Sequence, residues 1–202
     1  MTPKFVLASN SPRRRELLSM IGMDFEIIVS DCDESAVADR TPDKLVRELA
    51  RLKATAVADT LDPSCDYIVI GADTVVCDGE RILGKPQNEA DAKATLLSLS
   101  GRKHSVWTGV ALVGCGKCVT DAVETKVVFG NISEADADFY VGTKEPMDKA
   151  GSYAVQGIGG FFISELHGDY YNVVGLPIAR LRELLETQFG LVSSEYVGKV
   201  RR

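Results

Sequence analysis

The sequence predicts an α/β protein with a twisted mixed β-sheet flanked by helices, arranged as two lobes around a cleft. Short apolar runs alternate with segments whose apolar residues recur at helical spacing along the 202-residue chain. The run Tyr67–Ala72 is apolar throughout, as expected for a strand buried on both faces. Residues 104–114 and 118–130 are β-rich and are joined by a turn at residues 114–117, which predicts a hairpin.

The N-terminal third predicts a strand, a tight turn and a helix, and then a second strand and helix. Residues 4–9 are apolar enough for a strand, and Pro12 suits the first position of a helix over residues 12–22. Residues 25–30 predict the second strand. The pair Thr41-Pro42 then opens a long helix with one apolar face.

The rest of the chain contains several local start and stop signals. Asp78-Gly79 follows an apolar run and predicts a hairpin turn, and Asn88 caps a helix over residues 88–99. Ser133 and Asp136 form a variant of the capping box. Short strands are expected at residues 153–155 and 160–165, followed by a final helix over residues 178–189. We therefore expect one domain over residues 1–189 and a basic, mobile tail over residues 190–202.

Composition limits the classes of function. The chain is 45% hydrophobic, enough for a substantial core, and has no run of about 18 apolar residues that would span a membrane. A net charge of −6 argues against a general nucleic-acid binder. No signal peptide is recognised and the cysteine count is odd, at five, so we expect a cytoplasmic protein with reduced thiols.

Cys115 and Cys118 form a CxxC pair that could suggest zinc binding or redox chemistry. A zinc site needs two further soft ligands, and the chain offers only His104 and His167. A thioredoxin-like pair begins a helix, whereas this one lies between two β-patterned runs. We interpret it as a hairpin turn with two incidental thiols.

The first turn of the chain has the residue types of a phosphate site. Ser9 and the following residues offer hydroxyl and backbone N–H groups, and Arg13, Arg14 and Arg15 follow directly. A helix N-terminus attracts anions, and guanidinium groups match phosphate oxygens. The alternative is a capped helix with solvated arginines.

Carboxylates follow two of the predicted strands. Asp31, Asp33 and Glu34 come after the second strand, where they could hold a hard divalent cation or form an ordinary acidic turn. Asp73 comes at the end of the buried strand, after two small residues that leave room for a ligand. An aspartate there can bind a metal or act as a base toward water.

Three further polar residues are candidate ligands. Lys85, in Gly84-Lys85-Pro86, is a point charge suited to phosphate. Lys53 on the long helix is either a second phosphate ligand or a solvated flank. Gln156 lies in a glycine-rich stretch and can donate and accept at once, so it could bind the imide edge of a pyrimidine base, unless the stretch is an ordinary loop.

These residues together resemble the Maf family of nucleoside triphosphate pyrophosphatases. The resemblance covers about residues 4–188 in family order and is specific as an ordered set. The matching segments are Ala8–Arg14, Asp33–Glu34, Leu52–Ala54, Gly71–Val76, Gly84–Pro86, Asp148–Tyr153, Gln156–Gly157 and Val173–Pro177.

The resemblance implies a homodimeric, Maf/ITPase-like α/β enzyme with a deep cleft. Such enzymes cleave a nucleoside triphosphate between the α- and β-phosphates with Mg²⁺ or Mn²⁺. Asp73 would be the general base and, with Glu34, would hold the metal. The residues that would bind the phosphates are Ser9, Arg13, Arg14, Lys53 and Lys85.

The resemblance also narrows the substrate. Arg13, Thr74 and Gln156 are similar to the branch that acts on dTTP and UTP, including modified pyrimidine triphosphates. Two alternatives stay open: a pyrophosphatase for 7-methyl-GTP or other non-standard purine triphosphates, and a nucleotide-binding regulator of cell division with little turnover. No nucleic-acid or membrane partner is expected.

Overall fold

The computed structural model describes residues 2–38, 41–63 and 66–198 and gathers the chain into two compact units. Unit 1 comprises residues up to Asp73, residues 108–123 and residues from Gly175 onward. Unit 2 comprises residues 74–107 and 124–174. Three long strands contribute residues to both units. The predicted extent of the domain, residues 1–189, stays a prediction.

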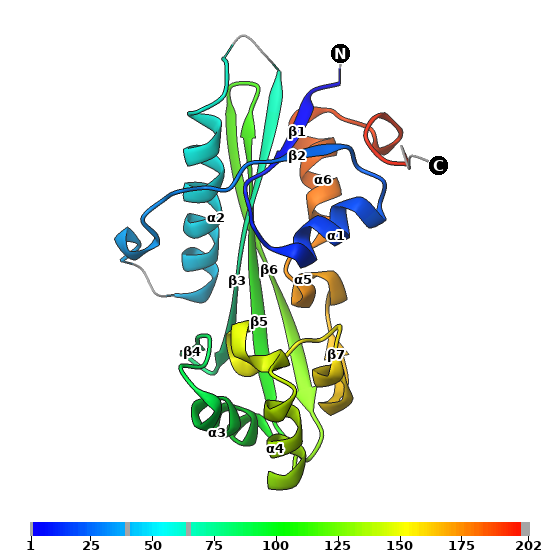
Figure 1. Cartoon of the computed structure of the whole chain (residues 1–202). Coiled ribbons are helices and arrows are strands. Elements are labelled where there is room, and N and C mark those ends of the chain that lie inside the picture. Colours follow the sequence, from blue (N-terminus) through cyan, green and yellow to red (C-terminus); the bar gives the residue numbers. More distant parts are fainter. Residues whose placement is uncertain (1, 39–40, 64–65, 199–202) are drawn as a thin grey trace. The chain divides into compact units, whose positions relative to one another are not determined.

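A seven-stranded mixed sheet forms the framework, as the sequence predicts (Figure 1). Its order is β2-β1-β3-β5-β6-β7, and β4 pairs with β3. Strand β1 pairs in parallel with β2 and β3, whereas β4 and β7 pair antiparallel with β3 and β6. The strands are β1 (Lys4–Leu7), β2 (Phe25–Ile27), β3 (Tyr67–Asp78), β4 (Arg81–Leu83), β5 (Lys103–Gly114), β6 (Lys117–Phe129) and β7 (Ile163–His167).

Six α-helices and five 3₁₀ turns are found in the described part of the chain. The helices are α1 (Pro12–Met20), α2 (Pro42–Ala58), α3 (Glu89–Leu99), α4 (Glu134–Gly142), α5 (Tyr170–Val174) and α6 (Ile178–Phe189). The 3₁₀ turns are η1 (Glu34–Ala36), η2 (Glu145–Asp148), η3 (Ala150–Ser152), η4 (Ile158–Phe162) and η5 (Ser193–Glu195).

In unit 1, helix α2 lies directly against β3 and β5 because two glycines leave room for its backbone. A Cβ atom on Gly71 would lie 2.2 Å from the carbonyl oxygen of Ala50, and one on Gly109 would lie 2.1 Å from that of Val46. Ala50 and Ala54 pack here with Val6 in a core of small apolar side chains. The small residues set how closely helix and sheet approach each other.

In unit 2, the local signals of the sequence appear where they were predicted. The Asn88 side chain caps α3 by accepting from the Asp91 amide, and Ser133 and Asp136 form the capping box of α4. Helices α3 and α4 pack together over a core that includes Phe129 and Tyr140. This core supports the loop that follows η3.

The structure differs from several of the predictions. The strand expected at residues 160–165 begins only at Ile163, after the 3₁₀ turn η4. Strand β3 continues through Asp73 to Asp78 instead of ending before it, although its pairing with β1 ends at Ile70. Residues 153–155 form no strand, because the left-handed backbone of Gly151 and Ser152 turns the chain just before them. The mobility of residues 190–202 stays a prediction; within that segment, Tyr196 is buried and its ring lies 5.7 Å from that of Phe5. Residues 199–202 of the tail lie outside the described residues.

The two exposed cysteines of the CxxC pair lie where the β5–β6 hairpin turns. Cys115 and Gly116 both have positive φ angles, of 50° and 71°, as the tight turn requires. Cys32, Cys77, Cys115 and Cys118 are free thiols, and Cys65 lies outside the described residues. None of the described helices is long and apolar enough to cross a membrane.

Candidate functional site

The parallel strands of unit 1 bring the predicted phosphate and carboxylate residues to one edge of the sheet. Leu7 of β1 lies opposite Ile27 of β2 and Ile70 of β3, so β1 and β2 end on the same side of the sheet, where the pairing of β3 with β1 also ends. Ser9 follows β1 and Asp73 lies three residues beyond Ile70. Ligands of α/β proteins bind at such carboxyl ends.

The turn between β1 and α1 is organised by the hydroxyl of Ser9. This buried side chain accepts from the amide of Ser11 at 3.2 Å and from Nη1 of Arg14, also at 3.2 Å. Nε of Arg14 donates to the carbonyl oxygen of Gly175 at 2.8 Å. The Arg14 guanidinium is therefore held in a fixed orientation at the start of α1, where Pro12 occupies the first position.

Lys53 bridges the two predicted metal-binding carboxylates. Its ammonium nitrogen lies 2.6 Å from Oδ1 of Asp73 and 3.1 Å from Oε1 of Glu34. Lys53 and Asp73 side chains are each 13% exposed, whereas that of Glu34 is 55% exposed. Lys53 is thus not a solvated flank, and its charge lies between two acids at the edge of the sheet.

The close approach at Gly71 explains how Lys53 meets Asp73. Ala50 and Ala54 of α2 lie against Gly71 of β3, and Lys53 stands next to Ala54 while Asp73 stands two residues after Gly71. Any larger residue at position 71 would push the helix away and lengthen the Lys53–Asp73 contact. The glycine therefore acts on the site through helix position.

Glu34 contacts Lys53, whereas its neighbour Asp33 has another role. The Asp33 carboxylate accepts from both the amide and the hydroxyl of Ser35, at 2.9 and 2.6 Å, and so caps η1. Both hydrogen bonds lower the pKa of Asp33, and the one from the Ser35 hydroxyl has the larger effect. Asp31 is exposed. Of the three acids predicted as a possible cation site, Glu34 is the one that meets Asp73 through Lys53.

Opposing charges surround Arg14. Burial lowers the pKa of its guanidinium and the charge of Arg13 lowers it further, while Asp73 and Glu34 act in the opposite direction. An arginine nonetheless stays charged at neutral pH. Two guanidinium groups, one ammonium and two carboxylates thus interact within unit 1, which gives this edge cationic groups for an anionic ligand and acidic oxygens for a cation.

The residues fit a divalent cation that arrives with a phosphate ligand. Oxygens of Asp73 and Glu34 converge on one cationic nitrogen, and carboxylate oxygens are ligands that Mg²⁺ and Mn²⁺ accept. No group of three or more metal-binding side chains occurs among residues 2–38, 41–63 and 66–198. Magnesium commonly binds in this way, with one or two protein carboxylates completed by phosphate oxygens and water.

Three predicted site residues belong to unit 2. Thr74 follows Asp73 in β3, where successive side chains point to opposite faces, and is partly buried. Lys85 follows β4 and is exposed, as is Gln156 in the loop before η4. The roles of Thr74, Lys85 and Gln156 stay predictions. The predicted residues that the geometry of unit 1 brings together are Ser9, Arg13, Arg14, Glu34, Lys53 and Asp73.

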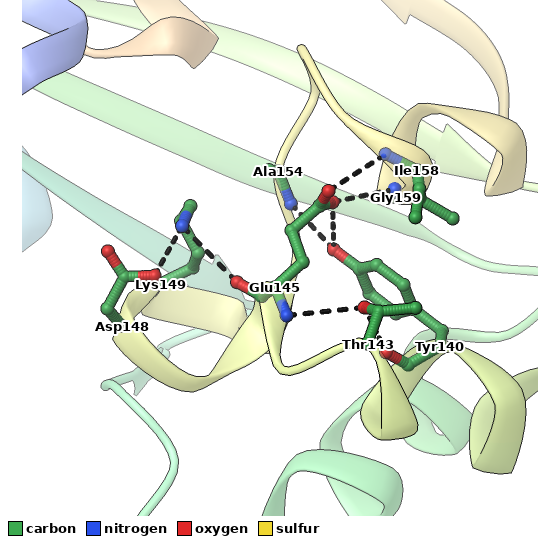
Figure 2. A network of polar contacts seen from close by, with 8 residues as sticks. All are labelled: Tyr140, Thr143, Glu145, Asp148, Lys149, Ala154, Ile158 and Gly159. Atoms are coloured by element: carbon green, nitrogen blue, oxygen red, sulfur yellow. Dashed lines mark hydrogen bonds and ion pairs between the residues drawn. The ribbon is translucent and has the colours of Figure 1, made fainter.

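Sequence reasoning missed a second polar network, which lies in unit 2 (Figure 2). There, Glu145 accepts hydrogen bonds from Tyr140 and from two backbone amides of the segment after Gln156. Nothing in the local sequence marks Glu145, because the two backbone amides that it accepts from lie 13 and 14 residues further on. The sequence also did not predict that Arg14 donates to the carbonyl oxygen of Gly175, although Val173–Pro177 is one of the segments that carry the family resemblance.

The family model and the curated relatives identify the family of this chain. The family model described as Maf-like protein matches residues 4–188. A protein named dTTP/UTP pyrophosphatase from Bacillus thuringiensis subsp. konkukian is 53% identical over 182 residues, which cover 90% of this chain and 94% of that protein. A protein of the same name from Bacillus cytotoxicus is 51% identical over 188 residues, covering 93% and 97%. The solved structure of the Staphylococcus aureus Ham1 protein matches 65% of this chain and 72% of its own at 18% identity, with a TM-score of 0.43.

Proposed function

Because this chain belongs to the Maf-like protein family, we propose that it hydrolyses nucleoside triphosphates between the α- and β-phosphates, giving a monophosphate and pyrophosphate. The proposed substrates are dTTP, UTP and modified pyrimidine analogues, as the names of its relatives suggest. The observation that carries the proposal is the Lys53 bridge between Asp73 and Glu34, beside the Ser9–Arg14 corner.

Phosphoryl transfer needs positioning and charge neutralisation more than covalent chemistry, and unit 1 offers both. Arg14 is already oriented by Ser9 and by the Gly175 carbonyl, so little side-chain freedom would be lost when it binds phosphate oxygens. We assign the triphosphate to Arg13, Arg14, Lys53 and Ser9, with Lys85 as a further cationic ligand.

Asp73 is the proposed general base. A carboxylate oxygen takes a proton from the water that cleaves the α–β bond, and pyrophosphate leaves with the bridging oxygen. Oδ1 of Asp73 contacts Lys53 in the free protein. A phosphate tail that draws the Lys53 ammonium to its own oxygens would leave Asp73 to act on water.

A divalent cation, Mg²⁺ or Mn²⁺, is the proposed cofactor. Asp73 and Glu34 would hold it, and the cation would neutralise charge on the phosphate oxygens when bound. The two carboxylates already share one cation in the free protein, which supports this assignment. The cation would then take the place of the Lys53 ammonium between the two acids, while Lys53 binds phosphate oxygens.

Base recognition is assigned to Gln156, with Thr74 and Arg13 as the other residues that favour pyrimidine substrates. The Gln156 amide can donate to a carbonyl oxygen of the base and accept from its N3–H group. Thymine and uracil carry that pattern, whereas cytosine lacks the N3–H group. We further propose that the enzyme is a cytoplasmic homodimer without nucleic-acid or membrane partners, an assignment that rests on the family resemblance and the net charge of −6.

The decisive experiment measures pyrophosphate release from dTTP, UTP, 5-methyl-UTP, CTP, GTP and 7-methyl-GTP, with Mg²⁺, with Mn²⁺ and with a chelator. We expect metal-dependent release that favours dTTP and UTP. Release mainly from 7-methyl-GTP would keep the reaction and overturn the assigned specificity. Nucleotide binding without release from any substrate would overturn the reaction and favour a regulatory role.

A further inference from the structure

The polar network of unit 2 ties down both ends of the segment that contains Gln156 (Figure 2). Oε1 of Glu145 accepts from the Tyr140 hydroxyl at 2.8 Å and from the amide of Gly159 at 3.0 Å, and Oε2 accepts from the amide of Ile158 at 3.1 Å. The same Tyr140 hydroxyl oxygen accepts from the amide of Ala154 at 3.1 Å. One tyrosine–glutamate pair therefore fixes the backbone two residues before Gln156 and two and three residues after it.

Two glycines make room for this pair. A Cβ atom on Gly157 would lie 2.2 Å from Oε2 of Glu145, and one on Gly159 would lie 2.5 Å from the Tyr140 hydroxyl oxygen. Neither glycine has a positive φ angle, so its lack of a side chain serves close approach rather than backbone conformation. The loop is thus built around the carboxylate and the phenol.

The pair is itself well supported by unit 2. Tyr140 is fully buried in α4, and its ring packs edge-to-face on Phe162 with centroids 5.3 Å apart. Nζ of Lys149 donates to the backbone oxygen of Glu145 at 3.2 Å. Burial and the bond to Glu145 raise the pKa of Tyr140, which keeps the phenol protonated as a donor. By contrast, Gln156 is exposed, and its amide makes no hydrogen bond to a residue that the structure describes.

We propose that Glu145, acting with Tyr140, is a positioning residue that orients Gln156 and thereby sets the preference for uracil-type bases. This inference rests on the proposed function, in which Gln156 binds the nucleobase of the substrate. A side chain that discriminates by paired hydrogen bonds needs a fixed backbone, because small displacements weaken both bonds at once. Glu145 supplies that fixed point without touching the substrate.

The primary variant is Glu145→Gln, which keeps the size of the side chain and removes the charge. Its amide NH₂ group must face one of the donors that the carboxylate now accepts from, so at least one bond of the network is lost. Glu89→Gln is the matched control, because Glu89 is an exposed acid of the same unit that pairs only with the Lys144 side chain in the contacts observed. Tyr140→Phe, which removes the hydroxyl and keeps the ring, is the second variant should Glu145→Gln fail to fold.

The kinetic measurement compares kcat/KM for dTTP and CTP. We expect Glu145→Gln to lower the dTTP-to-CTP ratio by about tenfold, mainly through KM for dTTP, and Glu89→Gln to leave it unchanged. Added to Gln156→Ala, the Glu145→Gln change should cause no further loss of selectivity, since both act through one side chain. An unchanged ratio in Glu145→Gln, or additive losses in the double variant, would overturn the proposal.

Hydrogen exchange separates this inference from the proposed function. The amides of Ile158 and Gly159 should exchange about tenfold faster or more in Glu145→Gln than in the wild type and in Glu89→Gln. Unchanged exchange would overturn the positioning role whatever the enzyme hydrolyses. Exchange could instead be faster in Glu145→Gln while Gln156→Ala keeps normal selectivity. Glu145 would then hold the loop, but Gln156 would not bind the nucleobase. The role of Glu145 in specificity would be overturned as well.

Discussion

Asp73 in unit 1 and Glu145 in unit 2 are two partly buried carboxylates with different kinds of partner. Asp73 contacts the ammonium group of Lys53, at the end of a long flexible side chain. Glu145 accepts from two backbone amides and a buried hydroxyl. A side-chain cation can turn to another anion when one arrives, whereas backbone amides within a 3₁₀ turn cannot. The kind of partner therefore separates an acid poised for chemistry from an acid that holds structure.

The electrostatics of Glu145 agree with a structural role. Burial by itself raises the pKa of this carboxyl, but the hydrogen bonds from Gly159, Tyr140 and Ile158 and the charge of Lys149 outweigh it and lower the pKa overall. The acid is thus ionised at neutral pH and remains an acceptor for all three donors. Its contribution to stability is present above the carboxyl pKa of the unfolded chain and is lost as the pH falls through the lower folded value.

The largest effect should come from Asp73→Asn, which tests the chemical side of the comparison. We expect kcat to fall by about 10³-fold, because a positioned general base contributes on the order of 10² to 10⁴ to the rate. Nucleotide affinity and the melting temperature should stay close to those of the wild type. The same carboxylate-to-amide change at Glu145 should leave kcat nearly intact. Pre-steady-state turnover and calorimetric binding of dTTP provide the measurements, and full activity in Asp73→Asn would refute the assigned role.

The second effect tests whether helix α2 positions Lys53 through its contact at Gly71. In Gly71→Ala the new Cβ would lie 2.2 Å from the Ala50 carbonyl oxygen, so helix and strand must separate. We expect a loss of about 3 kcal/mol in the free energy of unfolding, as for an overpacked core. Among folded molecules kcat should also fall. Gly142→Ala is the control, since no atom lies within 4 Å of the added Cβ. Urea denaturation measures the free energy of unfolding, and turnover at low temperature measures kcat of the folded enzyme. An unchanged kcat in Gly71→Ala would contradict the role of this contact in positioning Lys53.

The features that could be predicted from the sequence are those that local chemistry decides. The Asn88 cap, the Ser133–Asp136 capping box, the Asp78–Gly79 turn and the helix over residues 178–189 all depend on residues within a few positions of one another. The Ser9–Arg14 contact is local in the same way, because the two residues are five positions apart, whereas their role in phosphate binding stays a prediction. The alternating pattern of strands and helices then sufficed for the fold class.

The features that could not be predicted depend on distant segments. Lys53 and Asp73 are twenty residues apart, and their contact follows from the docking of α2 on Gly71, which no local pattern reveals. Residues 153–155 include apolar side chains suited to a strand. They form none, because the backbone of Gly151 and Ser152 is left-handed and Tyr153 is buried. Tertiary packing decided both outcomes.

The smallest expected effect concerns the acid sensitivity of the structural unit. His104 in unit 2 is buried, and its Nε2 lies 2.8 Å from the hydroxyl oxygen of Tyr153, which precedes the loop of Gln156. Its Nδ1 has no hydrogen-bond partner among the described residues. Burial, with the charge of Arg102, lowers the pKa of His104 to about 4 against the weaker opposing effect of Asp78. The folded protein thus holds this ring neutral where the unfolded chain begins to protonate it.

Between an unfolded pKa near 6.5 and a folded value of about 4, the unfolded state binds the extra proton. Stability due to His104 is therefore fully present above pH 6.5 and is lost as the pH falls through this window, by about 1 kcal/mol from pH 7.5 to pH 5.5. A His104→Gln variant should lose this part of the slope while keeping a polar partner for Tyr153. Urea unfolding of both proteins at several pH values measures the difference, which isolates His104 from the carboxylates that titrate at lower pH. Equal slopes in the two proteins would mean that the buried ring does not couple folding of unit 2 to acid.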